Sequence, residues 1–283
     1  MTRVAIVTDS AADLTPAAAA ADAITVVPLE VSFGDQRFKA GLDLSTEAFW
    51  QRMTAPDAPF PKTAAASAGD FQTAFERLFA EGVDSIVCIN IAGSLSGTLK
   101  ASRIAREQLP ERDIHVVDSG SASMGEGLLT QMAAEMARAG RSAADIAATI
   151  DDRKADLNLY VALDTLEYLK RGGRISGAQA AVGTLLSVKP IITIKDGAVE
   201  TVDRPRTRSR ARERVLELLT ERPVERVAVL HTMADDVDGF RAELIRRMPG
   251  GIDEGLVSVQ PVGPSVGPHL GPGGIGGVVL YRR

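Results

Sequence analysis

The sequence is poor in cysteine, histidine and aromatic residues. Its single cysteine, Cys88, excludes an internal disulfide and a cysteine-based zinc cluster, and it fits a reducing cytoplasm. The three histidines, His115, His231 and His269, have neither HxxxH nor HxH spacing, so we expect no metal site. Aromatic residues make up only 4% of a chain that is 45% hydrophobic, so the core must consist of Val, Ile, Leu and Ala.

Long apolar runs and an excess of positive charge are also absent. No uninterrupted apolar stretch reaches the roughly 18 residues that a membrane span needs. The N-terminus lacks the basic region and apolar segment of a secretion signal, so we expect a cytoplasmic protein. A formal net charge of −5 opposes non-specific binding of nucleic acid by the whole surface. We therefore expect no nucleic-acid partner, although a local basic patch is compatible with this charge.

Short β-rich runs alternate with helical segments in the first half of the sequence. The strand-like runs cover residues 4–7, 24–27, 31–33, 85–91 and 114–117. Helices are predicted after a capping box that begins at Ser67, over residues 95–109 and 124–139, and after Ser142. This alternation predicts a parallel sheet covered by helices.

The pattern changes after about residue 155. A strand at 157–163, a short helix ending near Arg171 and a hairpin turning at Asp196-Gly197 predict a mixed sheet. Strands at 226–231 and 256–260 flank a helix near 236–248, and the Gly- and Pro-rich tail 263–277 predicts a long loop. The predicted fold class is therefore α/β with two domains. An N-terminal parallel-sheet α/β domain covers residues 1–155, and a C-terminal α+β domain with a mixed sheet covers residues 156–283.

Two segments at predicted strand ends carry polar residues that suit a ligand. Thr8-Asp9-Ser10 follows the first strand, where the carboxyl ends of parallel strands face a ligand crevice. Capping of the next helix by Asp9 or Ser10 is the alternative, and it is the favoured interpretation. Residues 93–98 begin a helix, whose N–H groups attract an anion. Ordinary capping by Ser94 or Ser96 is the alternative there.

Three further segments combine basic residues with glycine. Gly172-Gly173 allows a sharp turn that positions Arg174, or it simply ends a helix. Six arginines occupy alternate positions from 204 to 214, where cations near a helix start cost about 0.3–1 kcal/mol each. That cost indicates a compensating anion or acidic partner, unless the run is a solvated face paired with Glu213 and Glu217. His269 lies in the glycine-rich tail, where a backbone can approach a ligand closely.

These segments occur together in an order that resembles the DegV family. The matching residues are Thr8-Asp9-Ser10, Asp13-Leu14, Thr63 with Ser67, Leu95 to Thr98, Val117-Asp118-Ser119, Lys189-Pro190 before Asp196-Gly197, and His269 to Gly273. The most specific string is Leu166-Glu-Tyr-Leu-Lys-Arg-Gly-Gly-Arg-Ile-Ser176. The resemblance runs from about residue 3 to the C-terminus.

The resemblance implies a bacterial lipid carrier rather than an enzyme. Members of the DegV family bind a long-chain fatty acid in an apolar tunnel between and within their two domains. The best-understood members are the binding subunit of fatty acid kinase. A separate ATP-dependent kinase subunit phosphorylates the bound carboxylate to an acyl phosphate for phospholipid synthesis. We accordingly expect no catalytic residue and no cofactor in this chain, and peripheral contact with a membrane is compatible with lipid exchange.

The same resemblance assigns roles to individual residues. Carboxylate binding falls to Thr63, Ser94, Ser96, Gly97 and His269, while Arg174 and Arg206 would act at the rim towards the kinase. The tunnel candidates are Phe33, Phe71, Phe75, Leu95, Leu128, Met132, Leu185 and Ile275. The chain departs from the family at Ala64 to Ala66, where Ser-Gln-Pro is usual, and at Ala92-Gly93, where two serines are usual. We expect Ser94 to substitute for one missing hydroxyl.

Two other functions compete with the lipid carrier. The DegV fold is similar to the substrate-binding subunit of dihydroxyacetone kinases, in which a histidine holds the substrate covalently, so His231 or His269 would take that role in a phosphotransfer subunit. The sequence has no nucleotide-binding loop and no acidic metal cluster to support such an enzyme. A DNA-binding regulator rests only on the arginine run.

Overall fold

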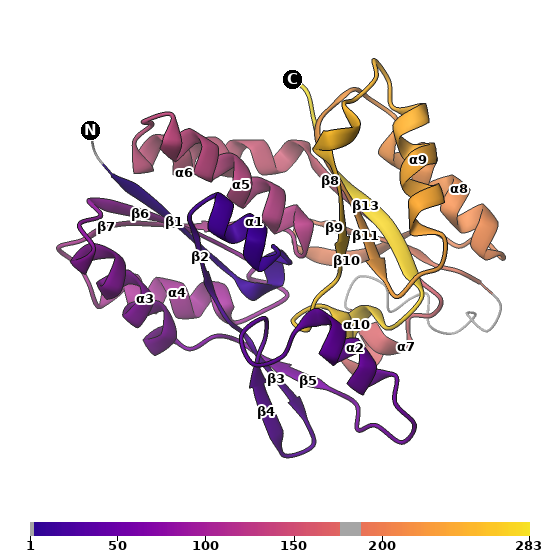
Figure 1. The fold of residues 1–283 in the computed structure, drawn as a ribbon, viewed down its shortest axis with the longest axis horizontal. Coiled ribbons are helices and arrows are strands. Elements are labelled where there is room, and N and C mark those ends of the chain that lie inside the picture. Colours follow the sequence, from indigo (N-terminus) through magenta and orange to yellow (C-terminus); the bar gives the residue numbers. More distant parts are fainter. Residues whose placement is uncertain (1–2, 176–187) are drawn as a thin grey trace.

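A four-stranded parallel sheet organises the first half of the molecule. The computed structural model describes residues 3–175 and 188–283. The strand order is β2 (Ile24–Val27), β1 (Val4–Asp9), β6 (Ser85–Asn90) and β7 (Asp113–Asp118), all parallel. Helices α3 (Ala68–Ala80) and α4 (Thr98–Glu107) cover one face, and α5 (Met124–Arg138) and α6 (Ala143–Arg153) cover the other (Figure 1). The predicted helix-covered parallel sheet is confirmed.

Local sequence signals explain where these elements begin and what they bury. Ser67 and Asp70 form the predicted capping box, with Ser67 Oγ accepting from Asp70 N at 3.1 Å. Strand β6 is buried on both faces, which is why its sequence is a continuous apolar run. Helix α4 starts at Thr98, three residues later than predicted, because the chain from 93 to 97 first crosses the end of the sheet as a loop.

A small antiparallel sheet and one helix extend from the first half towards the second. The sheet has the order β4 (Gln36–Lys39), β3 (Glu30–Phe33) and β5 (Lys62–Ala64), and helix α2 (Thr46–Met53) lies between β4 and β5 in sequence. Trp50 Nε1 donates to Val262 O at 2.9 Å, so α2 is anchored to the C-terminal part of the chain. Helices α1 (Pro16–Ala21) and α7 (Glu167–Arg171) are short connectors.

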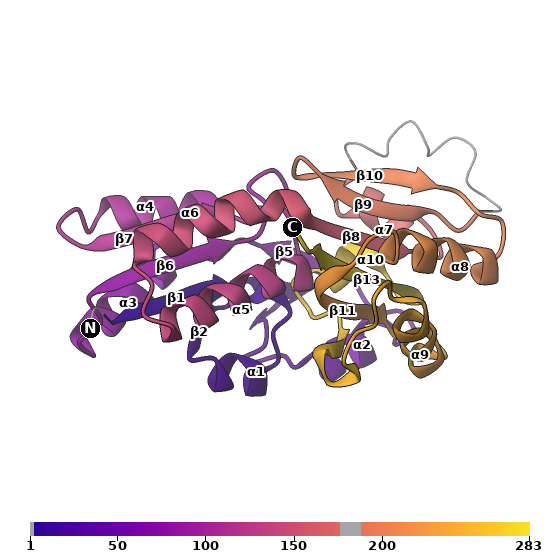
Figure 2. The same ribbon diagram turned by 90° about the horizontal axis from the view of Figure 1, so that it is seen from above.

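A six-stranded mixed sheet organises the second half. Its order is β10 (Ala198–Asp203), β9 (Ile191–Lys195), β8 (Leu157–Ala162), β13 (Gly274–Tyr281), β11 (Val224–Thr232) and β12 (Val257–Pro261). Helices α8 (Arg208–Leu219) and α9 (Val237–Arg247) pack on one face, while α5 reaches across to the other face (Figure 2). The mixed sheet is confirmed, including the β9–β10 hairpin with left-handed Asp196 and Gly197. The domain boundary near residue 155 stays a prediction.

The glycine-rich tail is not the long loop that we predicted. Residues 267–270 form helix α10 (Gly267–Leu270), and residues 274–281 form β13, which pairs with both β8 and β11. A Cβ at Gly276 would overlap the carbonyl oxygen of Tyr160, and one at Gly277 would lie 2.9 Å from Ala228 O. Glycine is therefore required here because neighbouring backbones approach closely, and this requirement also occurs inside sheets.

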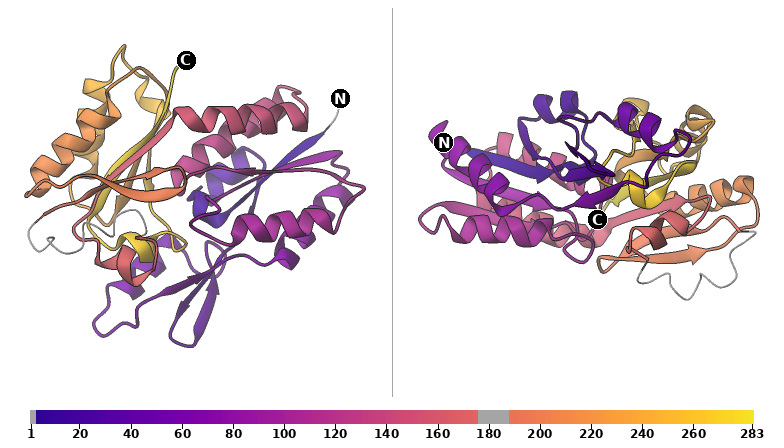
Figure 3. Two further views of the ribbon diagram at one scale, coloured as in Figure 1. Left: turned by 180° about the vertical axis from the view of Figure 1, so that it is seen from behind. Right: turned by 90° about the horizontal axis from the view of Figure 1, so that it is seen from below.

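Helices α7 and α10 lie together near α2, below the six-stranded sheet (Figure 3). Gly267 of α10 packs against Phe49 and Trp50 of α2, where a Cβ would lie 2.6 Å from Phe49 Cε1. These contacts fix the segment that carries His269. In the part of the chain that the structure describes, no helix is both long and apolar enough to cross a membrane.

Candidate functional site

An apolar cavity lies between the carboxyl end of the four-stranded sheet and the inner face of the six-stranded sheet. It holds about 100 Å³. Its lining comes from both halves of the chain: Leu29, Thr63, Ala64, Ala65, Ile91, Leu95, Ser96, Gly97, Ala122, Ser123, Leu159, Val161, Leu169, Arg174, Ile192, Ile194, Val199, Leu230, Ser265, Val266, His269 and Leu270. The interior between the sheets is thus hollow and is surrounded mainly by aliphatic side chains.

Strand periodicity creates the apolar wall. Leu159 and Val161 of β8, and Ile192 and Ile194 of β9, are spaced two residues apart, so each pair points to the same face of the sheet. The intervening residues of β8 join a different hydrophobic cluster, under α8 and α9. Alternation therefore directs Leu159 and Val161 of β8, and Ile192 and Ile194 of β9, into the cavity.

Polar groups gather at one end of this cavity. Thr63 Oγ1 of β5 lies 3.0 Å from His269 Nε2 of α10. Ser96 and Gly97 precede α4, and Ser96 Oγ lies 2.8 Å from Thr98 Oγ1 and accepts from Thr98 N at 3.3 Å. The first turn of a helix has N–H groups without intrahelical partners, which favour an anion. Hydroxyls, a helix start and an imidazole are thus assembled from three separate elements.

His269 is a neutral group in this setting. Burial, assisted by the positive charge of Arg174, lowers the pKa of His269 to about 4. Its Nδ1 is buried and has no hydrogen-bond partner among the described residues. Nδ1 packs on Gly172, where any Cβ would overlap the ring. A neutral imidazole can donate one hydrogen bond to a carboxylate, and which nitrogen carries the proton depends on the tautomer.

Arg174 supplies the only ionised side chain among the described lining residues. Its Nε donates to Leu95 O at 3.1 Å, and its Nη1 donates to Gly172 O at 2.7 Å. The guanidinium therefore joins the loop before α4 to the end of α7. This arrangement places one positive charge at the polar end without a carboxylate partner in the lining.

The structure does not bring Ser94 and Arg206 into the lining. The Ser94 hydroxyl donates to Gly197 O in the turn of the β9–β10 hairpin, so it is directed away from the cavity. Arg206 is exposed on the segment between β10 and α8. Ala64 and Ala65 do line the cavity, where the family usually has polar residues. Ser96 is consequently better placed than Ser94 for a carboxylate, and the roles of Ser94 and Arg206 stay predictions.

Most of the predicted tunnel residues are packed elsewhere. Leu95 lines the cavity, and Leu185 lies outside the described residues. Phe71, Phe75 and Leu128 belong to the hydrophobic core beside the cavity. Met132 packs against the core between α5, α6 and the first sheet. Phe33 packs on Phe49, and Ile275 lines a different cavity. Large rings fill the helix–sheet interfaces, whereas the cavity wall is aliphatic. The signal that would have found the wall was the two-residue alternation in the runs 157–163 and 190–194.

Two lining serines, Ser123 and Ser265, are held by the turn after β1. Asp13 accepts from Ser123 Oγ at 2.6 Å and from Gly263 N at 2.9 Å, and Ser10 Oγ lies 2.8 Å from Ser265 Oγ. Asp9 caps the short turn Ser10–Ala12 by accepting from Ala11 N at 2.9 Å. The Thr8-Asp9-Ser10 segment therefore supports the cavity wall, and none of its three residues lines the cavity.

Burial strongly shifts the pKa of the Asp13 carboxyl group. Burial raises the pKa of Asp13 to about 7, because a carboxylate loses its hydration there, although Ser123 and Gly263 oppose the shift. Over the described residues, no three His, Cys, Asp or Glu side chains are placed to hold a metal ion.

A narrow aliphatic cavity with one polar end has the shape and chemistry that suit an amphipathic small molecule. Residues 3–282 match the family described as "Uncharacterised protein, DegV family", so the chain belongs to the DegV family. A DegV domain-containing protein of Streptomyces coelicolor is 36% identical over 289 residues, which cover 99% of each chain.

Solved structures support the same relationship. A DegV family protein from Thermus thermophilus, described by its fatty acid binding, has 31% identity and a TM-score of 0.89, covering 99% of this chain and 100% of that one. A stearic-acid-binding protein from Eubacterium ventriosum has 28% identity and a TM-score of 0.87, covering 99% and 98%. Over the residues that the structure describes, the fold of this chain is therefore the DegV fold.

Proposed function

We propose that this protein binds one long-chain fatty acid in the aliphatic cavity and presents the carboxyl group to a separate ATP-dependent kinase. The observation that carries the proposal is the polar end formed by Thr63, Ser96 and His269 on an otherwise apolar cavity. Solved relatives described as fatty-acid-binding proteins support the choice of ligand.

The alkyl tail supplies the driving force. A sixteen-carbon acid has about fourteen methylenes, which offer about 11 kcal/mol gross at about 0.8 kcal/mol each. Association and ordering cost several kcal/mol of this, and a tight complex still results. The cavity holds about 100 Å³, well below the roughly 300–1,000 Å³ of pockets for drug-sized ligands. We therefore expect the aliphatic walls to move apart when the chain enters.

The polar end sets the position of the carboxylate. Hydroxyls, helix N–H groups and a neutral His269 can hold a carboxylate by charge-assisted hydrogen bonds. Arg174 is already engaged with two backbone carbonyls, so it stabilises the charge without a bidentate pair. A carboxylate held in this way keeps an oxygen available for attack on the terminal phosphate of ATP.

Presentation to a separate kinase fits a chain that offers a carboxylate-binding end and a basic side chain near it. The acyl phosphate formed would supply phospholipid synthesis, and Arg174 and the exposed Arg206 would face the kinase or the transferred phosphoryl group. We propose that this occurs in the cytoplasm, where ATP and the kinase meet the carrier. Lipid exchange at a membrane surface would require only peripheral contact.

Native mass spectrometry of the purified protein tests the ligand directly. We expect an added mass of a few hundred daltons, about 256 for a sixteen-carbon saturated acid, that is lost on extraction with organic solvent. A protein that gains no such mass after incubation with fatty acid would contradict the proposal.

Phosphoryl transfer tests the presentation. With kinase and ATP, Ser96→Ala should lower the rate of acyl phosphate formation or the affinity for the acid, whereas Ser258→Ala on β12 should change neither. Unchanged rate and affinity in Ser96→Ala would remove Ser96 from the site. The carrier with ATP and no kinase should form no phosphorylated product from the acid or from small hydroxyketones, and turnover there would favour the phosphotransfer enzyme instead.

A further inference from the structure

A second cavity lies on the opposite face of the six-stranded sheet. It holds about 240 Å³ at the carboxyl ends of β8 and β11, beside the first turns of α8. Ligands of open α/β sheets commonly bind beyond the carboxyl ends of the strands. Ala162 of β8 lines this cavity, whereas its neighbour Val161 lines the lipid cavity, so the sheet itself separates the two.

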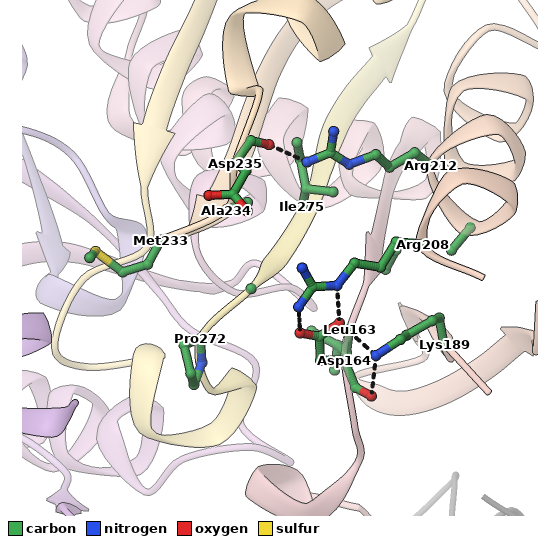
Figure 4. A pocket seen from close by; sticks show the side chains of 13 residues that line it. Leu163, Asp164, Lys189, Arg208, Arg212, Met233, Ala234, Asp235, Pro272 and Ile275 are labelled. Atoms are coloured by element: carbon green, nitrogen blue, oxygen red, sulfur yellow. Dashed lines mark hydrogen bonds and ion pairs between the residues drawn. The ribbon is translucent and has the colours of Figure 1, made fainter. Parts of the chain in front are cut away.

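Basic side chains from separate segments converge on one side of this cavity (Figure 4). Lys189 Nζ donates to Asp164 Oδ1 at 2.9 Å, and Arg208 Nε donates to the same oxygen at 2.9 Å. Arg208 Nη2 donates to the other carboxylate oxygen. Arg212, one turn further along α8, lines the same cavity and donates to Asp235 O.

Asp164 positions these cations and does not saturate them. Its carboxylate packs on Gly273, where a Cβ would lie 2.6 Å from Oδ2 and the backbone has φ +86°. A lysine ammonium has three N–H donors and a guanidinium has five. Asp164 receives two from Lys189, one of them through its backbone O, and two from Arg208. Among the described residues, at least one donor on Lys189 and three on Arg208 thus have no partner.

The charge and shape of the lining select the class of ligand. Lys189 and Arg208 share one carboxylate, Asp164, which leaves one net positive charge beside it, whereas Arg212 is paired with Asp236 at 3.5 Å. The guanidinium fork matches the oxygens of a phosphate. The floor is apolar and includes Ala211 and the buried Ile275.

We propose that this cavity is a second binding site, for a small phosphate monoester with a short apolar body. The phosphate lies against Lys189 and Arg208, and the body of the ligand lies on Ala211 and Ile275. Met233 lines this cavity and is 56% exposed. Its backbone is left-handed, with φ 57°. The site is independent of the lipid cavity and goes beyond the proposed carrier function.

Calorimetric titration of the whole protein with inorganic phosphate and with propyl phosphate tests this site. We expect saturable binding, tighter for the monoester because inorganic phosphate leaves the apolar floor uncovered. Lys189→Gln and Arg208→Gln should each weaken binding about tenfold or more, because each removes a charge-assisted hydrogen bond. Arg210→Gln, on the same helix but outside the lining, should leave binding unchanged.

Two further measurements distinguish a loss of binding from a loss of folding in the variants. The methyl signal of Met233, assigned with Met233→Leu, should shift on addition of propyl phosphate to the unmodified protein. Bound fatty acid, measured by native mass, should be unchanged in the Lys189 and Arg208 variants, which shows that they are folded. No saturable binding, an unmoved Met233 signal, or undiminished binding in both folded variants would overturn the proposal.

Discussion

Replacing Thr63 with valine removes a single hydroxyl from the polar end of the lipid cavity. Valine has nearly the shape of threonine and suits strand β5, so the wall of the cavity stays filled. The change leaves His269 Nε2 without its partner at 3.0 Å and takes one donor away from a bound carboxylate. Any loss of affinity then reports on the head group, because the aliphatic wall is untouched.

The size of the effect follows from the charge on the ligand. A hydrogen bond to a charged group contributes about 1.5–3 kcal/mol, and one between neutral groups contributes about 1 kcal/mol. Since about 1.4 kcal/mol corresponds to a factor of ten, Thr63→Val should weaken palmitate binding by roughly 10- to 150-fold. Binding of hexadecanol, which has the same tail and a neutral head, should weaken by only about fivefold.

The assay is competitive displacement of a fluorescent fatty acid, with palmitate and hexadecanol titrated against each variant. Thr63→Ser keeps a hydroxyl and should bind palmitate nearly as well as the unmodified protein. Thr25→Val is the matched control, because Thr25 is a partly buried threonine on strand β2 that does not line the cavity.

Equal losses for the acid and the alcohol would refute the reasoning. That result would mean that Thr63 shapes the cavity instead of contacting the carboxylate. No loss for either ligand would place the head group elsewhere, and the assignment of the polar end would then be wrong.

Three further predictions concern titration and packing. Burial lowers the pKa of His269 to about 4, so NMR titration of its ring should show no midpoint near 6.5. The pKa of Asp13 is raised from 3.8 to about 7, so the folded state binds more protons and loses about 4 kcal/mol of stability as pH rises through this window. The free energy of unfolding of Asp13→Asn, measured in urea relative to the unmodified protein, should therefore increase from pH 5 to pH 8. An equal difference at both pH values would contradict this prediction. Gly276→Ala should cost about 3 kcal/mol or more in calorimetry, because its Cβ meets Tyr160 O, whereas Gly69→Ala within helix α3 should be neutral or stabilising.

The elements of the fold were largely predictable because their signals are local. A continuous apolar run identified β6, a capping box identified the start of α3, and Asp196-Gly197 identified the β9–β10 turn. Strand β13 was not predictable in this way. Its glycines are needed because Tyr160 and Ala228, which lie far away in sequence, bring their backbones close to it. Nothing within residues 263–277 distinguishes that requirement from a flexible loop.

The polar end of the cavity was accessible from sequence only through family resemblance. Thr63, Ser96, Arg174 and His269 come from four segments, and the structure brings them together at one end. No spacing within the sequence specifies this arrangement, because it depends on how β5, the loop before α4, α7 and α10 pack. The direction of the Ser94 side chain was equally inaccessible, since it depends on contact with the β9–β10 turn.

One strand explains how the two proposed binding sites can coexist in a chain of this size. Along β8, Leu159 and Val161 face the lipid cavity, while Tyr160 and Ala162 face α8. The inner face needs only bulky aliphatic side chains to form a dry wall. On the outer face Ala162 lines the second cavity, and Arg208 of α8 donates to Asp164 just beyond the strand end. A two-residue period thus gives the sheet two chemically different surfaces, and a substitution at 161 or 162 should affect one site without the other.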